Sequence, residues 1–165
     1  MKFIEPPLCT RCGLPYQGAL PGSFACEPCR ESELQFRSAR SAVAFNSEVL
    51  ELIHRYKYNR AFWFEPLLAQ WLIVKAAPLL AQEHWDFIVP IPLHPTKQRE
   101  REFNQAERLG RRLSLATGIP LNSRLVGRVR ATETQTRLSR PERLDNVRNA
   151  FAPRRGVRLG GQRVV

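Results

Sequence analysis

Four cysteines near the N-terminus form the most specific chemical pattern in the chain. They occur as two pairs, Cys9 with Cys12 and Cys26 with Cys29, and each pair has the spacing Cys-x-x-Cys. Such pairs form tight turns that direct two thiolates toward one ion, and Gly13 fits the first of these turns. Because thiolates would fill all four tetrahedral positions, the ion would be structural and not catalytic. We therefore expect residues 1–38 to form a small four-cysteine zinc module.

Two disulfides or four free thiols are the alternatives to a metal site. The chain begins Met1-Lys-Phe-Ile-Glu-Pro-Pro, without the apolar segment of an export signal, which predicts a reducing cytoplasm where disulfides are rare. The longest apolar stretch, residues 66–81, is interrupted by Gln70, Lys75 and Pro78 and is short for a bilayer span. The sequence thus favours zinc over disulfides, in a cytoplasmic protein without membrane insertion.

A second pattern follows a short apolar run at residues 87–93. Pro90 and Pro92 interrupt the run, and a basic loop is predicted from His94 to Arg101. An amphipathic helix is predicted next, over residues 103–117, ended by Gly118. A strand, a basic loop and a helix in this order bring backbone N–H groups and cations to the carboxyl end of a strand. Open α/β sheets bind phosphorylated ligands there, so this stretch predicts a phosphate-handling loop.

The candidate ligands for phosphate or nucleic acid carry positive charge or hydrogen-bonding groups in or near this loop. Each arginine alone could equally be a solvated surface group or the partner of a carboxylate. The histidine could instead be a cap or an exposed residue, and the asparagine stands where Asn commonly caps a helix. As a cluster, however, they favour anion binding. The candidates are His94, Lys97, Arg99, Arg101, Asn104, Arg128, Arg130 and Arg137.

Positive charge is concentrated in the C-terminal part of the chain. The formal net charge is +11, and residues 93–165 carry 17 Lys/Arg against 6 Asp/Glu, whereas the two signs balance in residues 1–92. A one-sided basic segment predicts a polyanionic partner such as nucleic acid, or a phosphate-rich small ligand. A solvated Arg-rich surface without a specific partner is the alternative.

Alternating helical and strand patterns must position these residues. Ser47 is predicted to cap a helix that runs through Tyr56, and Pro66 to open a second helix with Leu67, Leu68, Trp71, Leu72 and Val74 inward. Trp63 and Trp71 are assigned to core or interdomain packing, in preference to a platform on which bases stack. A further helix is predicted over residues 141–150 after a cap at Ser139, and a polar loop precedes it at residues 131–139. Strands are predicted at residues 41–46, 87–91, 124–130 and 163–165. This alternation predicts an α/β fold with parallel strand pairing.

Several short segments complete a recognisable combination with the four cysteines. They are Tyr56-Lys57-Tyr58, residues 89–93, 99–105, 135–138 and 140–143, together with Asn146, Asn149 and Phe151. The combination resembles the ComF family of competence proteins and covers nearly the whole chain. The resemblance implies a four-cysteine zinc module at residues 1–38, followed over residues 39–165 by a partial type I phosphoribosyltransferase-like domain. That domain would have a parallel sheet with flanking helices.

Two departures from the family pattern bear on activity. The family usually has Gly where Glu102 stands, and Glu adds a negative charge and a Cβ beside the expected phosphate loop. By resemblance, two adjacent aspartates and a Thr-Thr-Gly turn should hold phosphoribosyl pyrophosphate (PRPP), but the only aspartates are Asp86 and Asp145. We therefore expect a C-terminally truncated member of the family that is inactive or impaired as a transferase.

By resemblance, the expected role is that of an accessory protein in DNA uptake and natural transformation. Such a protein would bind single-stranded DNA through the basic C-terminal surface and work with a competence helicase and a DNA-loading protein. A phosphoribosyltransferase using PRPP and Mg²⁺, active in a full-length relative, is the first alternative. A zinc-ribbon module that docks other proteins is the second.

Overall fold

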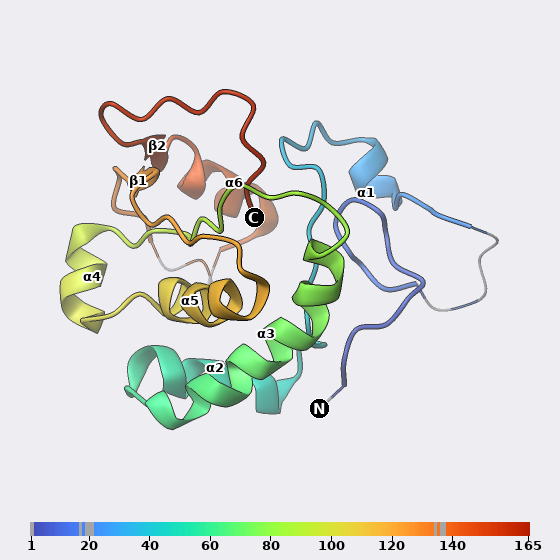
Figure 1. Ribbon diagram of the computed structural model, residues 1–165, viewed down its shortest axis with the longest axis horizontal. Helices are drawn as coiled ribbons and strands as arrows, with labels where there is room; N and C mark the ends of the chain where they lie inside the picture. Colours follow the sequence, from blue (N-terminus) through green and yellow to red (C-terminus); the bar gives the residue numbers. More distant parts are fainter. Residues whose placement is uncertain (1, 17, 19–21, 134, 136–137) are drawn as a thin grey trace.

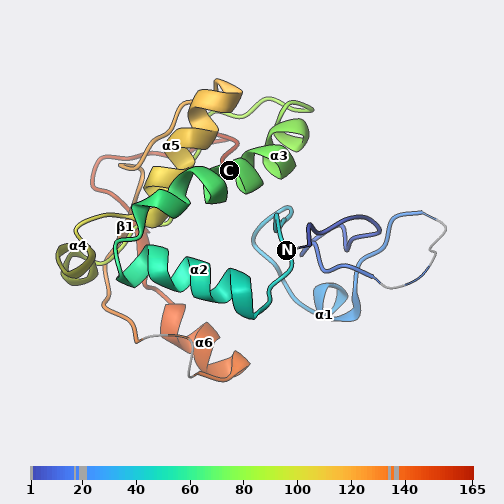
Figure 2. The same cartoon turned by 90° about the horizontal axis from the view of Figure 1, so that it is seen from below.

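The computed structural model describes residues 2–16, 18, 22–133, 135 and 138–165. A segment with the short helix α1 (Glu27–Arg30) forms one end of the molecule, and α4 (Pro95–Arg101) lies at the opposite end in both views (Figures 1 and 2). Between them lie α2 (Ser47–Tyr58), the 3-10 helix η1 (Phe62–Phe64), α3 (Glu65–Leu80) and α5 (Gln105–Thr117). Strands β1 (Val126–Arg128) and β2 (Phe151–Pro153) and helix α6 (Arg140–Val147) complete the regular elements of the described residues.

Helix α2 begins one residue earlier than predicted because Asn46, not Ser47, is its cap. The Asn46 side chain accepts a hydrogen bond of 2.8 Å from the backbone N–H of Val49, which satisfies one of the free donors of the first turn. The helix ends at Tyr58, and Arg60 after it has a left-handed backbone with φ of 53°. The predicted helix is therefore confirmed, with a shift of one residue at the start.

Helix α3 buries a narrower face than predicted. Leu68 and Trp71 are buried, but Leu67 and Val74 are exposed, because the helix packs on α5 along one side only. Trp63 in η1 is 72% exposed, so its assignment to the core is wrong. No helix in the described ranges combines the length and apolar character required to cross a membrane.

The segment from His94 to Arg101 is a helix, α4, and not the predicted basic loop. Nδ1 of His94 at the cap accepts a hydrogen bond from the Thr96 N–H at 3.4 Å, and Pro95 occupies the first turn. Proline stops a helix when it falls inside one, but at the first turn its fixed φ favours helix formation. Lys97 and Glu100, which are paired at 2.8 Å, add support between successive turns.

Helix α5 begins at Gln105, two residues later than predicted, because Asn104 caps it. Oδ1 of Asn104 accepts hydrogen bonds from the N–H groups of Ala106 at 2.9 Å and Glu107 at 3.4 Å. Its amide donates to the carbonyl of Ile91 at 3.0 Å, which ties the start of α5 to the segment before α4. Gly118 ends the helix as predicted, with φ of 74°.

Two small apolar clusters form the core. Both involve α3 and α5, so the packing of these two helices joins them (Figure 1). The first cluster contains Val49, Tyr56, Leu68, Trp71 and Phe103, and the second contains Leu80, Ile88 and Leu113.

A buried carboxylate, that of Glu65, connects α2, α3 and α5. The residue is 4% exposed, and its carboxylate accepts hydrogen bonds from the Tyr56 hydroxyl at 3.1 Å and from Nε of Arg112 at 3.3 Å. Arg108 of α5 forms a further ion pair with the same group. Burial acts to raise the pKa of Glu65, but hydrogen bonding to Arg108 and Tyr56 outweighs it and the pKa lies below its ordinary value. The carboxylate is therefore a charged structural link between three helices.

Strand pairing is less extensive than predicted. β1 and β2 pair antiparallel, with Gly127 opposite Ala152, and β1 is shorter than the predicted strand at residues 124–130. In the described part of the chain, parallel pairing in this region occurs as single bridges, Phe87 with Val164 and Ile88 with Leu121. The predicted strands at residues 87–91 and 163–165 thus meet in the expected direction, but they form isolated bridges and not an extended parallel sheet.

Two other predicted elements differ in extent. Of residues 41–46, Val43 forms one antiparallel bridge with Phe3. Helix α6 ends at Val147, three residues earlier than predicted, and the chain then enters β2, which the sequence did not indicate. The cap of α6 is Ser139 as predicted, although the helix begins one residue earlier, at Arg140. The backbone N–H of Ser139 donates to the Glu142 carboxylate at 2.7 Å.

Candidate metal centre and anion-binding surface

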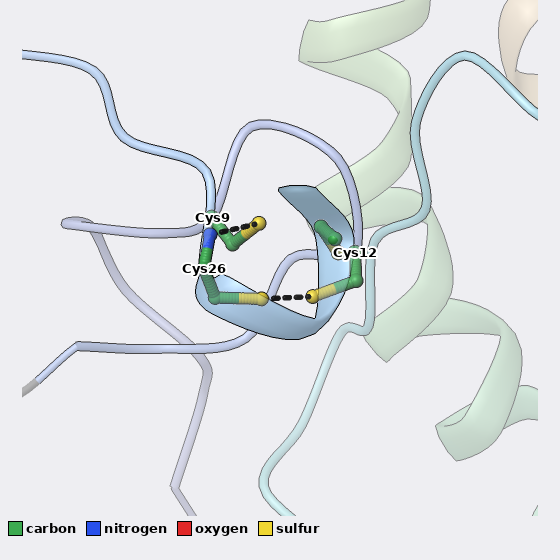
Figure 3. Close-up of side chains that lie close together, drawn as sticks. Cys9, Cys12 and Cys26 are labelled. Carbon is green, nitrogen blue, oxygen red and sulfur yellow. Dashed lines mark hydrogen bonds between the residues drawn. The ribbon is translucent and has the colours of Figure 1, made fainter. Parts of the chain in front are cut away.

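The four cysteines converge on one point, as predicted. Their sulfur atoms lie within 4.8 Å of one another, and Sγ of Cys12 lies 3.6 Å from Sγ of Cys26 (Figure 3). All four thiols are free. A disulfide requires about 2.05 Å between sulfur atoms, whereas two thiolates on one tetrahedral ion at about 2.3 Å are separated by about 3.8 Å. The arrangement therefore fits four ligands of a single metal ion and could hold one.

Tight turns at both cysteine pairs produce this convergence. The N–H of Gly13 donates to the carbonyl of Cys9 at 3.0 Å, and Gly13 has φ of 72°, a conformation that favours glycine. A Cβ at Gly13 would lie 2.6 Å from the backbone oxygen of Ala39. In the second pair, the N–H of Cys29 donates to the carbonyl of Cys26 at 2.9 Å as α1 begins. The predicted role of Gly13 in the first turn is confirmed.

The thiols affect one another electrostatically. A hydrogen bond of 3.3 Å from the backbone N–H of Cys26 is the largest influence on Cys9 and lowers the pKa of its thiol to about 6. Burial and the neighbouring cysteine sulfur atoms raise the pKa of Cys29 to about 12. Four thiolates this close cannot all remain ionised without a cation among them, so the ionised cluster requires a metal ion.

We call residues 1–38, which carry the four cysteines, the four-cysteine segment. Ion pairs attach this segment to the helical part of the protein. The Arg37 guanidinium binds the Glu83 carboxylate through two contacts of 2.6 Å, and Glu5 pairs with Lys75 on α3. The backbone N–H of Ala39 donates to the carbonyl of Arg11 at 2.6 Å. The cysteine cluster is therefore held in a defined position against the C-terminal half of α3.

Two of the predicted anion ligands, Lys97 and Arg101, line an open pocket of about 130 Å³ between the end of α2 and helix α4. The sequence predicted no ligand role for the other residues that line it. We call the positive residues at and beside this pocket the basic cluster: Lys57, Arg60, Lys97, Arg101 and, from β1, Arg128. Tyr58 and Glu100 complete the lining of the pocket.

Arg101 is the central residue of the basic cluster. Its guanidinium donates to the Tyr58 hydroxyl at 3.0 Å and to Oε1 of Gln105 at 3.0 Å, and it lies 4.7 Å from the Tyr58 ring centroid. Burial and the nearby charge of Arg101 lower the pKa of Lys57, and the same two causes lower the pKa of Arg128. Cations from α2, α4 and β1 are thus close enough to repel one another. Of the sequence candidates, Lys97 and Arg101 line the same pocket, and Arg128 lies within the electrostatic influence of Arg101.

The other candidates lie in different environments. Arg99 is exposed and makes no hydrogen bond or ion pair with the described residues. Arg130 donates to the carbonyls of Asp145 at 3.0 Å and Asn146 at 2.8 Å, which fixes the end of α6 to β1. Arg128 lies over the Phe151 ring and donates to the Thr132 hydroxyl. Arg137 lies outside the described residues.

His94 and Asn104 both cap helices, which confirms the structural alternative for each. His94 caps α4 and Asn104 caps α5. Their expected role as anion ligands stays a prediction. The residues that the sequence analysis missed are Lys57 and Arg60. The only signal for Lys57 was its place in the Tyr56-Lys57-Tyr58 segment of the family resemblance, to which no chemistry had been assigned.

Comparison with known proteins identifies relatives of this chain. Competence protein F of Haemophilus influenzae is 32% identical over 149 residues, which are 88% of this chain and 64% of that protein. DNA utilization protein YhgH of Salmonella typhimurium is 32% identical over 87% of the chain and 63% of its own length, and that of Escherichia coli K12 is 30% identical over 89% and 65%. The chain belongs to the ComF family. It spans less than two thirds of the length of each of these relatives.

No family model and no solved structure matches the chain. The backbone at Glu102 has a conformation that suits the glycine expected there. Glu102, where the ComF family usually has Gly, follows α4 and has φ of 65°. This left-handed conformation favours glycine because a Cβ there approaches the following carbonyl oxygen. Glycine, the residue that the resemblance implies at this position, would therefore relieve backbone strain at the end of α4.

Proposed function

We propose that this ComF-family chain is a DNA-handling accessory protein that binds single-stranded DNA through the basic cluster. The observation that carries the proposal is that Lys57, Lys97 and Arg101, from α2 and α4, line one open pocket. Arg128 of β1 lies near enough for the charge of Arg101 to act on it. Cations that repel one another gain most from an anion placed among them. The names of the relatives, Competence protein F and DNA utilization protein, support a nucleic-acid partner.

The position of the cluster suits an extended polyanion. It lies around α4, at the end of the molecule opposite the four-cysteine segment (Figure 1). The exposed Arg99 on the same helix extends the positive surface. Contacts of this kind recognise backbone phosphates, so binding is expected to tolerate any sequence and to weaken strongly with salt.

The remaining parts of the protein receive supporting roles in this proposal. The ion of the four-cysteine centre is zinc, because an all-thiolate tetrahedral donor set with this spacing is the usual structural zinc site. Residues 39–165 have a phosphoribosyltransferase-like fold. The protein works in the cytoplasm beside a competence helicase and a DNA-loading protein. The proposed activity is binding, and no transferase step is assigned to this chain.

Fluorescence anisotropy with a labelled oligothymidylate tests the proposal. If four phosphates are contacted, affinity should fall about 50-fold between about 50 and 200 mM salt, from a slope of about −0.7 per contact. The double variant Arg101→Gln, Arg128→Gln should bind more weakly and with a shallower salt slope. Arg130 is left intact because its contacts with the carbonyls of α6 make it structural.

A matched control removes the same charge elsewhere. Lys2→Gln with Arg30→Gln changes two exposed cations in the four-cysteine segment, outside the basic cluster. This control should keep most of the affinity of the unchanged protein. Equal affinity at both salt concentrations, or equal loss in the two double variants, would overturn the proposal.

A further inference from the structure

Helix α3 is apolar on all sides. Its 16 residues include only three with polar side chains, Glu65, Gln70 and Lys75. Of these, Glu65 is buried, and Lys75 is paired with Glu5. A helix without a polar face is normally covered on every side, as in the core of a larger protein. In the described part of the chain, however, α5 packs on one side of α3 and the opposite side is exposed (Figure 1).

The exposed side of α3 carries a continuous stripe of side chains. The stripe begins in η1, which runs directly into α3, and its members follow one another at intervals of four, three, four and four residues. Side chains at these intervals share one face of a helix. None of them is charged, so covering the stripe requires no desolvation of an ion. We call these exposed residues the outer stripe: Trp63, Leu67, Gln70, Val74 and Pro78.

The outer stripe has nearly the same pattern in both directions along the helix. Gln70, its one polar member, lies at the centre. Leu67 and Val74 lie three and four residues from Gln70, and Trp63 and Pro78 lie seven and eight residues from it. A two-fold interface requires such self-complementarity, because every contact between two different residues occurs twice. The pattern therefore suits a second copy of the same chain.

An antiparallel pair of α3 helices places complementary side chains opposite one another. Leu67 faces Val74 of the partner subunit, and the large ring of Trp63 faces the partner subunit's Pro78, which is small. Gln70 lies near the two-fold axis, where its amide can donate to and accept from Gln70 of the partner subunit. A single polar residue in an apolar interface between helices fixes their register. The antiparallel direction also aligns the two helix dipoles favourably.

We infer that the outer stripe is the interface of a weak, two-fold symmetric dimer of this chain. The positive excess lies in residues 93–165, whereas the two signs of charge balance in residues 1–92, which include the stripe. Two copies can therefore meet here with less repulsion than at the basic cluster. The interface centres on five residues and is smaller than the standard size of about 800 Å² per partner, so association is expected only at micromolar concentrations. The inference does not depend on the proposed function.

Sedimentation equilibrium of the full chain, freed of nucleic acid, tests for the dimer. The average mass should rise from that of one chain toward that of two as the concentration increases to about 200 μM. Association should strengthen with added salt, because screening reduces the repulsion between two copies of net charge +11. DNA binding is expected to respond to salt in the opposite direction. A protein that keeps the mass of one chain at this concentration overturns the inference and leaves the oligonucleotide result standing.

Charge exchange at Gln70 tests the two-fold geometry. Gln70→Glu and Gln70→Lys each place like charges opposite one another, so each variant alone should associate at least about tenfold more weakly. An equal mixture of the two should associate again, because opposite charges then meet at the axis. Gln82→Glu and Gln82→Lys are the matched controls, because Gln82 is exposed after the end of α3 and lies outside the stripe. A mixture that associates no better than its components overturns the inference.

Replacement of Trp63 distinguishes a second copy of the chain from nucleic acid as the partner of the stripe. Trp63 is 72% exposed, so Trp63→Ala should leave the fold intact, weaken self-association about tenfold and leave the affinity for oligothymidylate unchanged. Leu144→Ala is the control, because it removes an apolar side chain, 62% exposed, from α6. If Trp63→Ala self-associates normally and loses oligothymidylate affinity, Trp63 stacks on bases and the inference is overturned.

Discussion

Arg60 and Glu102 form an ion pair of 2.6 Å between Nη2 and Oε1, and both residues have a left-handed backbone. The pair joins the residues that follow α2 and α4, beside the basic pocket. A left-handed conformation costs a non-glycine residue about 1–2 kcal/mol. The two side chains are 57% and 63% exposed, and such pairs contribute about 0–1 kcal/mol. The ion pair therefore does not offset the backbone strain at its two ends.

Replacement of Glu102 by glycine should stabilise the protein. Glu102→Gly removes the strain at φ of 65° and loses only the exposed pair with Arg60, for an expected net gain of about 0.5–1 kcal/mol. Urea denaturation at neutral pH measures the change. Glu102→Ala is the control, because it loses the same ion pair but keeps the strain, and it should be slightly destabilising. A glycine variant no more stable than the alanine variant would contradict the account.

The buried carboxylate of Glu65 should be important for stability. Glu65→Gln keeps the shape but weakens the contacts with Arg108, Arg112 and the Tyr56 hydroxyl, with an expected loss of about 2 kcal/mol. The matched control is Glu51→Gln, which breaks the exposed pair of Glu51 with Arg55 and should cost less than about 0.5 kcal/mol. Equal losses in the two variants would show that Glu65 is no more than a surface partner.

The pH dependence of this difference follows from the lowered pKa of Glu65. A carboxyl group whose pKa is lower in the folded state stabilises the protein fully above its unfolded value of about 4.3. The stabilisation is lost as the pH falls through the folded-state pKa. The gap in unfolding free energy between the unchanged protein and Glu65→Gln should therefore be constant near neutral pH and close in acid. A gap that widens in acid would show that folding raises the pKa of Glu65 and does not lower it.

Local patterns in the sequence predicted the cysteine cluster and most helices well. Cys-x-x-Cys pairs, a glycine at a turn and caps such as Ser139 depend on neighbouring residues only, so a single sequence contains the information. The error at α4 is also local in origin. Residues 94–101 were predicted to form a loop, although Pro95 at the first turn favours a helix.

The basic cluster could be predicted only in part. Lys97 and Arg101 follow directly after the apolar run and were found, but Lys57 lies some 40 residues earlier in the chain and reaches them only through the packing of α2. The exposure of Trp63 and Leu67 was likewise missed, because helical periodicity shows which residues share a face and not whether a partner covers it. Both failures concern contacts between distant segments.

The turn at Gly13 should tolerate no side chain. Gly13→Ala combines a left-handed φ of 72° with a Cβ only 2.6 Å from the Ala39 oxygen, and we expect a loss of about 2 kcal/mol or more. Gly156→Ala is the control, with a similar φ of 81° but open space around the position, and it should cost about 1 kcal/mol. Thermal denaturation compares them. Equal melting temperatures for the two variants would exclude the contact with Ala39 as a cause.

Removal of the metal should unfold the four-cysteine segment before the rest of the protein. Mass spectrometry of the intact, folded protein should find one zinc ion per chain, because the four sulfur atoms within 4.8 Å fit a single ion. A chelator, or Cys29→Ser, should lower the melting temperature and expose residues 1–38 to proteases, since this segment has few apolar contacts and relies on metal ligation for stability.

The ion pairs of Arg37 with Glu83 and of Glu5 with Lys75 should then weaken, while α3 and α5 keep their own core. Chelator treatment of Cys29→Ser should have little further effect, which separates loss of the ion from other actions of the chelator. A protein that keeps both its melting temperature and its protease resistance after the ion is removed would show that the cluster does not depend on metal for its structure.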